Sequence, residues 1–212
     1  MSNMNSAYDP DCRRCPRLAS FLGDVRRERP GYFCRPVPAF GDPRARLLIV
    51  GLAPGMHGAN RTGRPFTGDH AGILLYETLH RFGFASSSAS VARDDGLVLR
   101  GVRITNAVKC LPPQNKPLPV EIRTCNGFLG AELAASPEAR VILALGTVAH
   151  AAVLRATGLK SGAHAFAHGA VHRLGDRMLL DSYHCSRYNT QTRRLTREMF
   201  EDVVARAARL AA

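Results

Sequence analysis

The sequence lacks every feature that would place the protein in or across a membrane. No apolar run approaches the roughly 20 residues that a transmembrane helix needs. The first twelve residues, MSNMNSAYDPDC, contain no apolar core of the kind found in secretory signal peptides. Internal repeats and linkers of biased composition are absent as well. We therefore expect a cytoplasmic protein that folds as a single domain over residues 1–212.

Acidic residues are scarce relative to basic ones. The chain has 17 Asp and Glu against 29 Lys and Arg, so its formal net charge is +12 at pH 7. This excess favours binding to a polyanion, either nucleic acid or an anionic membrane surface. The cations are scattered rather than gathered in one block, which argues against a disordered basic tail. A solvated basic surface without any partner is the alternative.

The apolar pattern alternates between strands and helices. Short apolar runs typical of buried parallel strands lie at residues 46–50, 139–146 and 176–184, and residues 97–110 read as strand, turn, strand. Helical spacing is found at residues 15–29, 73–82, 118–135, 147–158 and 193–212, and residues 159–170 read as a loop. This order predicts an α/β fold with a mainly parallel sheet covered on both faces. Ligands of such sheets bind at the carboxyl ends of the strands.

A glycine-rich segment, GLAPGMHGANRTGRPFTGD, follows the first predicted strand at residues 51–69. Its glycines let backbone amides approach a flat or anionic ligand without interference from side chains. The segment has neither the lysine and hydroxyl of a P-loop nor the G-x-G-x-x-G pattern, so nucleoside triphosphate binding is weakly supported. We interpret it as one wall of a binding site for another ligand.

Polar and aromatic residues near the strand ends indicate what that ligand is. Phe66 offers a stacking face, Asp69 a carboxylate, and Asn106 an amide that can read a base edge. His184 follows the last predicted strand. Together these residues favour recognition of a heterocyclic base. Each also has a plain structural alternative, because Asp69 can cap a helix, Phe66 can be core, and His184 can be a satisfied histidine at a strand end.

Four of the six cysteines form a pattern. Cys12 and Cys15 make a C-x2-C pair, and Cys110 and Cys125 flank a proline-rich loop far downstream. Disulfides do not persist in the cytosol, whereas four thiolates suit zinc or an iron–sulfur cluster. Spacing does not choose between these metals, and unrelated reduced thiols are the alternative. We expect a closed structural centre that ties the N-terminal segment to the sheet.

The motifs GLAPGMHGANRTGRPFTGD, ITNAVKCLPP and HCSRYNTQTRRLT, together with the four cysteines, resemble the family-five (type B) uracil-DNA glycosylases. The resemblance covers most of the chain in the right order. It implies a three-layer sandwich with a central four-stranded, mainly parallel sheet, and a [4Fe–4S] cluster on Cys12, Cys15, Cys110 and Cys125. Family-four enzymes would carry a glutamate at Leu52. The superfamily's best-known members would carry a catalytic aspartate at Ala53, and the resemblance assigns that role to Asp69 instead.

The implied activity is monofunctional excision of uracil, and of other deaminated or damaged bases, from DNA during base excision repair. The target nucleotide would be flipped into the pocket. The resemblance implies the following sites: Asp69 and His184 as catalytic residues, Gly51, Leu52, Ala53, Pro54, Gly55, Phe66 and Asn106 as base-binding residues, and Ser186, Arg187, Tyr188, Asn189 and Arg193 as DNA-binding residues. His57, Asn60 and Arg64 are candidate accessories. We expect a monomer whose partner is DNA. The alternative is a non-catalytic nucleic-acid-binding module that a structural metal centre holds together.

Overall fold

The computed structural model describes residues 8–212, so most of the N-terminal stretch MSNMNSAYDPDC lies outside the described residues. The α-helices are α1 (Pro16–Glu28), α2 (Ala59–Thr62), α3 (His70–Arg81), α4 (Pro119–Ala134), α5 (Thr147–Ala156), α6 (Arg187–Gln191) and α7 (Arg197–Ala211). The strands are β1 (Phe40–Gly41), β2 (Leu47–Gly51), β3 (Val102–Asn106), β4 (Val141–Leu145), β5 (Val171–Leu174) and β6 (Arg177–Ser182). Two short 3-10 helices, η1 (Pro113–Asn115) and η2 (Ser161–Ala163), lie in loops.

The sheet has the order β1-β3-β2-β4-β6-β5 within the described part of the chain. Its four inner strands, β3, β2, β4 and β6, are parallel, which agrees with the four-stranded parallel core implied by the resemblance. The short antiparallel strands β1 and β5 extend this core to six strands. Strand β5 forms a hairpin with β6 through Gly175, whose φ of 62° permits the tight turn. The first of the two strands predicted within residues 97–110 forms only an isolated bridge between Ala85 and Leu99.

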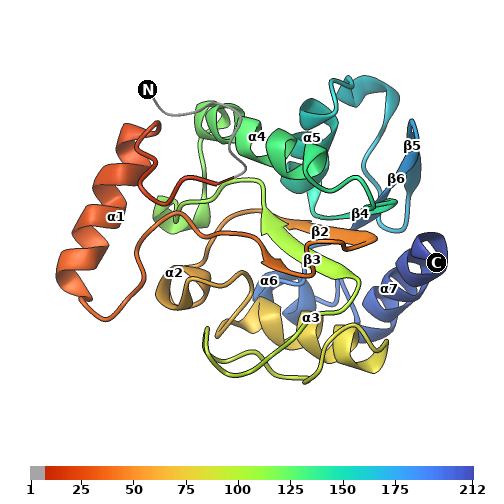
Figure 1. The fold of residues 1–212 in the computed structure, drawn as a ribbon, viewed down its shortest axis with the longest axis horizontal. Helices are drawn as coiled ribbons and strands as arrows, with labels where there is room; N and C mark the ends of the chain where they lie inside the picture. Colours follow the sequence, from red (N-terminus) through yellow and green to blue (C-terminus); the bar gives the residue numbers. More distant parts are fainter. Residues whose placement is uncertain (1–7) are drawn as a thin grey trace.

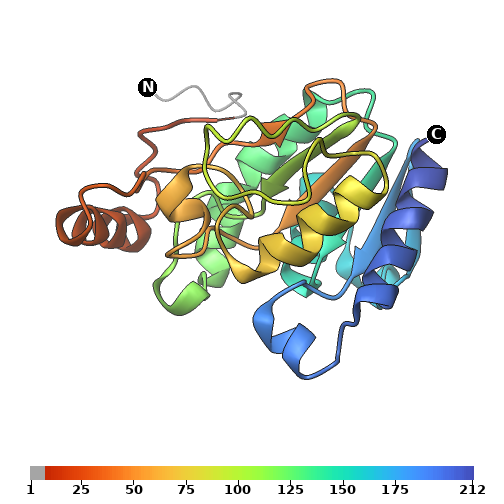
Figure 2. The same ribbon diagram turned by 90° about the horizontal axis from the view of Figure 1, so that it is seen from below.

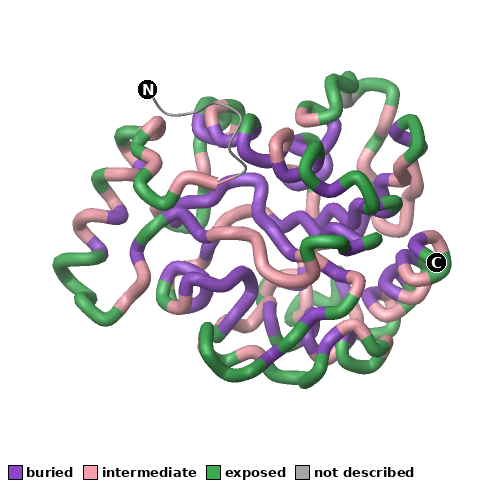
Figure 3. Tube along the Cα trace, viewed as in Figure 1, coloured by how far each residue is buried: buried purple, intermediate pink, exposed green. Residues whose placement is uncertain are grey.

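Helices cover both faces of the sheet, as the alternating pattern predicts (Figure 1). Successive residues of β2 point to opposite faces, so Leu47 and Ile49 join the core under α3 and α7, whereas Leu48 and Val50 join the core under α4 and α5. Figure 2 shows α3 and α7 on the same side of the sheet. The central strands are buried along most of their length (Figure 3). The result is a three-layer α/β sandwich.

Helix α1 lies at one end of the sandwich and not over a face of the sheet (Figure 1). Its buried residues Leu18, Leu22 and Val25 form a third apolar cluster, which also contains Cys110, Cys125 and Phe128. The N-terminal segment therefore packs on the same region as the downstream cysteines. None of the helices in the described residues is both long and apolar enough to cross a membrane.

Candidate active site

A cavity of about 480 Å³ opens at the carboxyl ends of the parallel strands. Residues that follow β2, β3, β4 and β6 reach it, as expected for a parallel sheet. Of the predicted site residues, the lining includes Leu52, Ala53, Gly55, Phe66, Asp69, Asn106, His184, Ser186, Arg187 and Asn189. Gly51, Pro54, Tyr188 and Arg193 are not part of this lining. One cavity thus brings together segments from residues 52 to 189.

The floor of the cavity depends on a glycine at the end of β2. Gly51 pairs in parallel register with Asn106 at the end of β3. A Cβ atom at Gly51 would collide with Oδ1 of Asn106 and with the ring of Phe66. Because the glycine has no side chain, the amide and the aromatic ring both occupy the space above it. Gly51 therefore acts behind the cavity wall and makes no lining contact itself.

Asn106 presents an unused hydrogen-bond acceptor. Its side chain is buried, and Oδ1 has no hydrogen-bond partner among the residues that the structure describes. A buried polar atom without a partner costs about 1–3 kcal/mol. The side chain also lines the cavity. This placement suits a ligand that brings a donor to Oδ1.

Phe66 adopts a backbone conformation that is rare for a bulky residue. Its φ is 53°, in the left-handed region, and its ring is almost fully buried. The carbonyl of Phe66 lies so close to Gly72 that a Cβ atom at Gly72 would collide with it. Oη of Tyr76 donates a hydrogen bond to the neighbouring carbonyl of Pro65 over 2.9 Å. These contacts from α3 hold the strained segment so that the ring faces the cavity.

Asp69 is the N-cap of α3, which is the structural alternative considered from the sequence. Its Oδ1 accepts a hydrogen bond from the backbone N–H of Gly72 over 2.9 Å. Its Oδ2 lies next to Gly58, where a Cβ atom would collide with the carboxylate. Burial raises the pKa of Asp69, and backbone hydrogen bonds from Gly72 and Ala71 partly oppose that shift. One carboxylate oxygen therefore caps the helix, and the residue as a whole still lines the cavity.

His184 lines the cavity beside Phe66 of the glycine-rich segment. Its ring centroid is 5.8 Å from that of Phe66, with 30° between the ring planes. Burial lowers the pKa of His184 to about 4, so the ring is neutral at physiological pH. Nδ2 of Asn189 donates to the carbonyl of His184 over 2.8 Å. Asn189 thus fixes the main chain of His184.

The predicted DNA-binding residues surround the short helix α6. Ser186 is its N-cap and accepts a hydrogen bond from the backbone N–H of Asn189 over 3.4 Å. Tyr188 keeps 70% of its surface exposed, and Arg187 and Arg193 are exposed as well. Arg193 has a φ of 55° and lies at the turn that leaves α6. Of these side chains, Arg187 also lines the cavity, and Tyr188 lies next to it on α6.

The three candidate accessory residues do not line the cavity. His57 is exposed, and its Nδ1 lies 2.9 Å from Oη of Tyr32. Asn60 is buried, and its Nδ2 lies 3.5 Å from Sγ of Cys34. Arg64 is buried and pairs with Asp95 over 2.5 Å. Arg64 and Asn60 therefore brace the glycine-rich loop.

Several residues of the cavity wall were not predicted from the sequence. They include Phe166 in the loop before β5, Tyr183 after β6 and Gly146 before α5. Tyr183 stacks on His168 with ring centroids 5.0 Å apart, and the guanidinium of Arg194 lies 4.7 Å from the centroid of the Tyr183 ring. Phe166 lies in the segment AHAFAHGA, which has no helical or strand periodicity. The sequence around Phe166 therefore did not predict that this residue lines the cavity. Tyr183 is adjacent in sequence to the predicted site residue His184, and this position could have indicated that it lies at the cavity.

The four predicted metal-ligating cysteines line one small pocket at the side of the sandwich. All are free thiols and come from the segment before α1, from the loop after β3 and from α4. Burial and the neighbouring Cys125 raise the pKa of the Cys15 thiol to about 11. The backbone N–H of Lys109 points at Sγ of Cys125 over 3.3 Å. The predicted convergence of the N-terminal and downstream cysteines is therefore present.

Comparison with known proteins identifies related chains. A family model described as the uracil DNA glycosylase superfamily matches residues 38–208. A type-5 uracil-DNA glycosylase of Thermus thermophilus is 54% identical over 206 residues, covering 94% of both chains. One from Pyrobaculum aerophilum is 45% identical over 202 residues, covering 93% of this chain and 88% of the relative. A type-4 uracil-DNA glycosylase of Archaeoglobus fulgidus is 34% identical over 139 residues, covering 65% of this chain and 56% of the relative.

Proposed function

Because the chain belongs to the type-5 uracil-DNA glycosylases of the uracil DNA glycosylase superfamily, we infer that it removes uracil from DNA by hydrolysing the N-glycosidic bond. The observation that carries this inference is the unpartnered Oδ1 of Asn106 in the cavity. Uracil carries a donor at N3 and an acceptor at O4. Oδ1 of Asn106 would accept the N3–H, and its Nδ2 would donate to O4. Thus one side chain would read the base edge.

Phe66 and the glycine-rich loop would hold the flipped base. The buried ring of Phe66 supports stacking, and Leu52, Ala53 and Gly55 line the wall beside it. Gly51 and Pro54 would act from behind this wall. Taking the base out of the duplex costs a few kcal/mol of stacking and pairing, which such contacts would offset. We propose that the same cavity also admits other deaminated or damaged bases.

His184 would stabilise the negative charge that develops on the leaving base. A neutral imidazole donates one ring N–H, and its place beside Phe66 suits donation to O2 of the base. The backbone N–H groups of Leu52, Ala53 and Gly55 would share this role. The N–H of Gly58 donates to the carbonyl of Gly55 over 3.3 Å, so it does not point at the base. A preorganised donor of this kind is worth about 3 kcal/mol.

Asp69 would act on the sugar side of the bond. Its Oδ1 is held by Gly72, which leaves Oδ2 to orient a water for attack at C1′ and to offset the positive charge on the sugar. The carboxylate must be ionised to do this. Attack by water breaks the C1′–N bond, gives an abasic site and leaves the DNA backbone intact. Helix capping and catalysis would thus use different oxygens of one carboxylate.

DNA would lie across the mouth of the cavity at α6. Ser186 and backbone amides would contact a phosphate, and Tyr188 or Asn189 would lie near the vacated stack. Arg187, Arg193 and Arg194 would add attraction that does not depend on sequence. We propose that the protein acts on DNA as a monomer.

The four cysteines would hold a [4Fe–4S] cluster with a structural role. Their donor set fits this group, because all four are thiols that meet in one pocket lined by Leu18, Val108 and Phe128. Zinc bound by the same four thiolates is the alternative. Purified protein should therefore be brown, whereas a colourless preparation with stoichiometric zinc would refute the cluster.

Base release is the experiment that tests the activity. A labelled duplex with one uracil is incubated with the protein, and abasic sites are then broken with alkali. Strand cleavage that needs alkali is expected from a monofunctional glycosylase. Asp69→Asn should lose most turnover but keep most DNA affinity, and a variant as active as the wild type would remove Asp69 from catalysis. DNA binding without cleavage of any substrate would instead indicate a non-catalytic binding module.

A further inference from the structure

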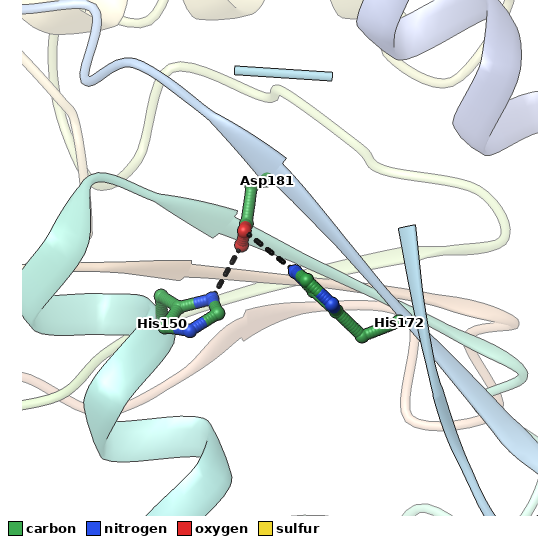
Figure 4. A group of neighbouring side chains, drawn as sticks. All are labelled: His150, His172 and Asp181. Carbon is green, nitrogen blue, oxygen red and sulfur yellow. Dashed lines mark hydrogen bonds and ion pairs between the residues drawn. The ribbon is translucent and has the colours of Figure 1, made fainter. Parts of the chain in front are cut away.

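Two histidines and one aspartate point toward one another (Figure 4); His150 and Asp181 are buried, and His172 is half-buried. His150 comes from α5, His172 from the edge strand β5, and Asp181 from β6. Nδ1 of His150 is 2.8 Å from Oδ1 of Asp181, and Nε2 of His172 is 3.2 Å from Oδ2. The three ligand atoms all lie within 4.8 Å of one another. These three residues belong neither to the lining of the base cavity nor to the pocket of the four cysteines.

The hydrogen bonds of His150 show that a proton or a metal ion must lie between its Nδ1 and Asp181. Nε2 of His150 lies 2.9 Å from the carbonyl oxygen of His164, so this nitrogen carries a proton and donates it. In a neutral ring Nδ1 would then be an acceptor, yet it faces a carboxylate oxygen. Asp181 is completely buried, and an isolated carboxylate in such a place is strongly unfavourable. Either a proton, carried by Nδ1 of His150 or by the carboxyl group of Asp181, or a metal ion therefore fills this contact.

We propose that His150, His172 and Asp181 form a second metal site, which takes a divalent transition ion of the zinc type. Imidazole nitrogens and a carboxylate oxygen are ordinary zinc ligands, and two ligands at about 2.0 Å from a tetrahedral ion lie about 3.3 Å apart. The distances of 2.8 and 3.2 Å are close to that spacing. The bond from Nε2 of His150 to a carbonyl matches the outer-shell contact that fixes the tautomer of a ligating histidine.

The surroundings allow an ion to enter and give it a structural role. The side chain of His172 keeps 14% of its surface exposed on the edge strand, whereas that of Asp181 is fully enclosed. Phe166, which lines the base cavity, has its ring centroid 5.7 Å from that of His150. An ion at this site would join α5, β5 and β6 behind Phe166 and Tyr183. It would stabilise the wall of the cavity and would take no part in the chemistry.

Zinc binding to the cluster-containing protein tests this site. The protein is treated with a mild chelator, its iron content is checked, and zinc is then titrated by calorimetry. We expect one zinc per chain in addition to the iron, and a higher melting temperature. Zinc X-ray absorption of the wild-type protein should show only nitrogen and oxygen neighbours. A sulfur shell at about 2.3 Å would place the zinc on cysteines and overturn the proposal.

Two variants and one control complete the test. His172→Ala and Asp181→Asn should each lower the bound zinc from one ion per chain to near zero. His80→Ala changes an exposed histidine at the end of α3 and should leave the binding unchanged. Absence of zinc binding in the wild-type protein would overturn the metal site and leave a proton between His150 and Asp181. If a variant fails to fold, the absorption spectrum of the wild-type protein still decides.

Discussion

The side-chain ammonium of Lys109 donates a hydrogen bond to the main-chain carbonyl of Asn106 over 3.0 Å. The same Nζ pairs with the carboxylate of Glu132 on α4 over 2.7 Å and donates to Oγ1 of Thr105 over 2.5 Å. Lys109 and Glu132 are both buried. The backbone N–H of Lys109 points at Sγ of Cys125. One residue therefore connects the proposed cluster site with the residue proposed to read the base.

Lys109→Met tests this connection. The change leaves Glu132 buried without its partner, and loss of one member of a buried pair costs about 3–5 kcal/mol of folding free energy. The double variant Lys109→Met with Glu132→Leu should recover much of the stability. It should still excise uracil more slowly, because no ammonium then holds the carbonyl of Asn106. Urea unfolding and single-turnover rates would measure the two effects.

The exposed ion pair between Arg81 and Glu201 supplies the control for Lys109. Arg81→Met should cost no more than about 1 kcal/mol and leave base release unchanged. A double variant of Lys109 and Glu132 with wild-type stability and wild-type rate would show that the buried pair has no role in positioning Asn106.

Gly51→Ala should abolish most activity. The new methyl group would collide with Oδ1 of Asn106 and the ring of Phe66, so at least one of these groups must leave the cavity floor. We expect the single-turnover rate to fall by about 100-fold or more, in line with the loss of a preorganised contact. Gly127→Ala on α4 is the matched control, because a methyl group there meets no atom within 4 Å. Equal rates for Gly51→Ala and wild type would contradict the proposed base site.

The pH dependence of the rate should follow the ionisation of Asp69, with no contribution from a histidine that titrates at its ordinary pKa. Burial raises the pKa of Asp69 above its ordinary 3.8, so the rate should fall as the pH is lowered through that raised value. The pKa of His184 is about 4, which keeps the ring neutral at higher pH and predicts no inflection near 6.5. Single-turnover rates between about pH 5 and 9 would check both expectations. His184→Gln should lower the plateau and keep the acid limb. An inflection near 6.5 that disappears in this variant would show that His184 titrates during catalysis.

Arg187→Ala should weaken DNA binding and reduce its salt dependence. Each cation that neutralises a phosphate contributes close to one unit to the slope of log affinity against log salt concentration, so the slope should fall by about one unit. Arg100→Ala is the control, because this exposed residue precedes β3 at the end of the sheet away from the cavity. Fluorescence anisotropy over a range of salt concentrations would measure both slopes. Identical slopes for Arg187→Ala and wild type would take Arg187 out of the DNA contact.

Local patterns in the sequence determined the main elements of the fold. The apolar runs predicted β2, β4 and β6 near their observed bounds, because a buried parallel strand needs apolar side chains on both faces. Helix α3 begins three residues before the predicted start at residue 73, since Asp69 supplies the N-cap. The convergence of Asp69, Asn106 and His184 also followed from the sequence, because parallel strands present their carboxyl ends at one edge.

Only the tertiary structure decided the partners of the buried polar groups. Lys109 contacts Glu132, which lies 23 residues further along the chain, and His150 contacts Asp181, which lies 31 residues further along. The periodicity of the local sequence predicts neither contact. The short strand β1 and the wall residue Phe166 are likewise defined by long-range packing. A period or a turn motif depends on neighbours along the chain. The partner of a buried charge depends on which elements the completed sheet brings into contact.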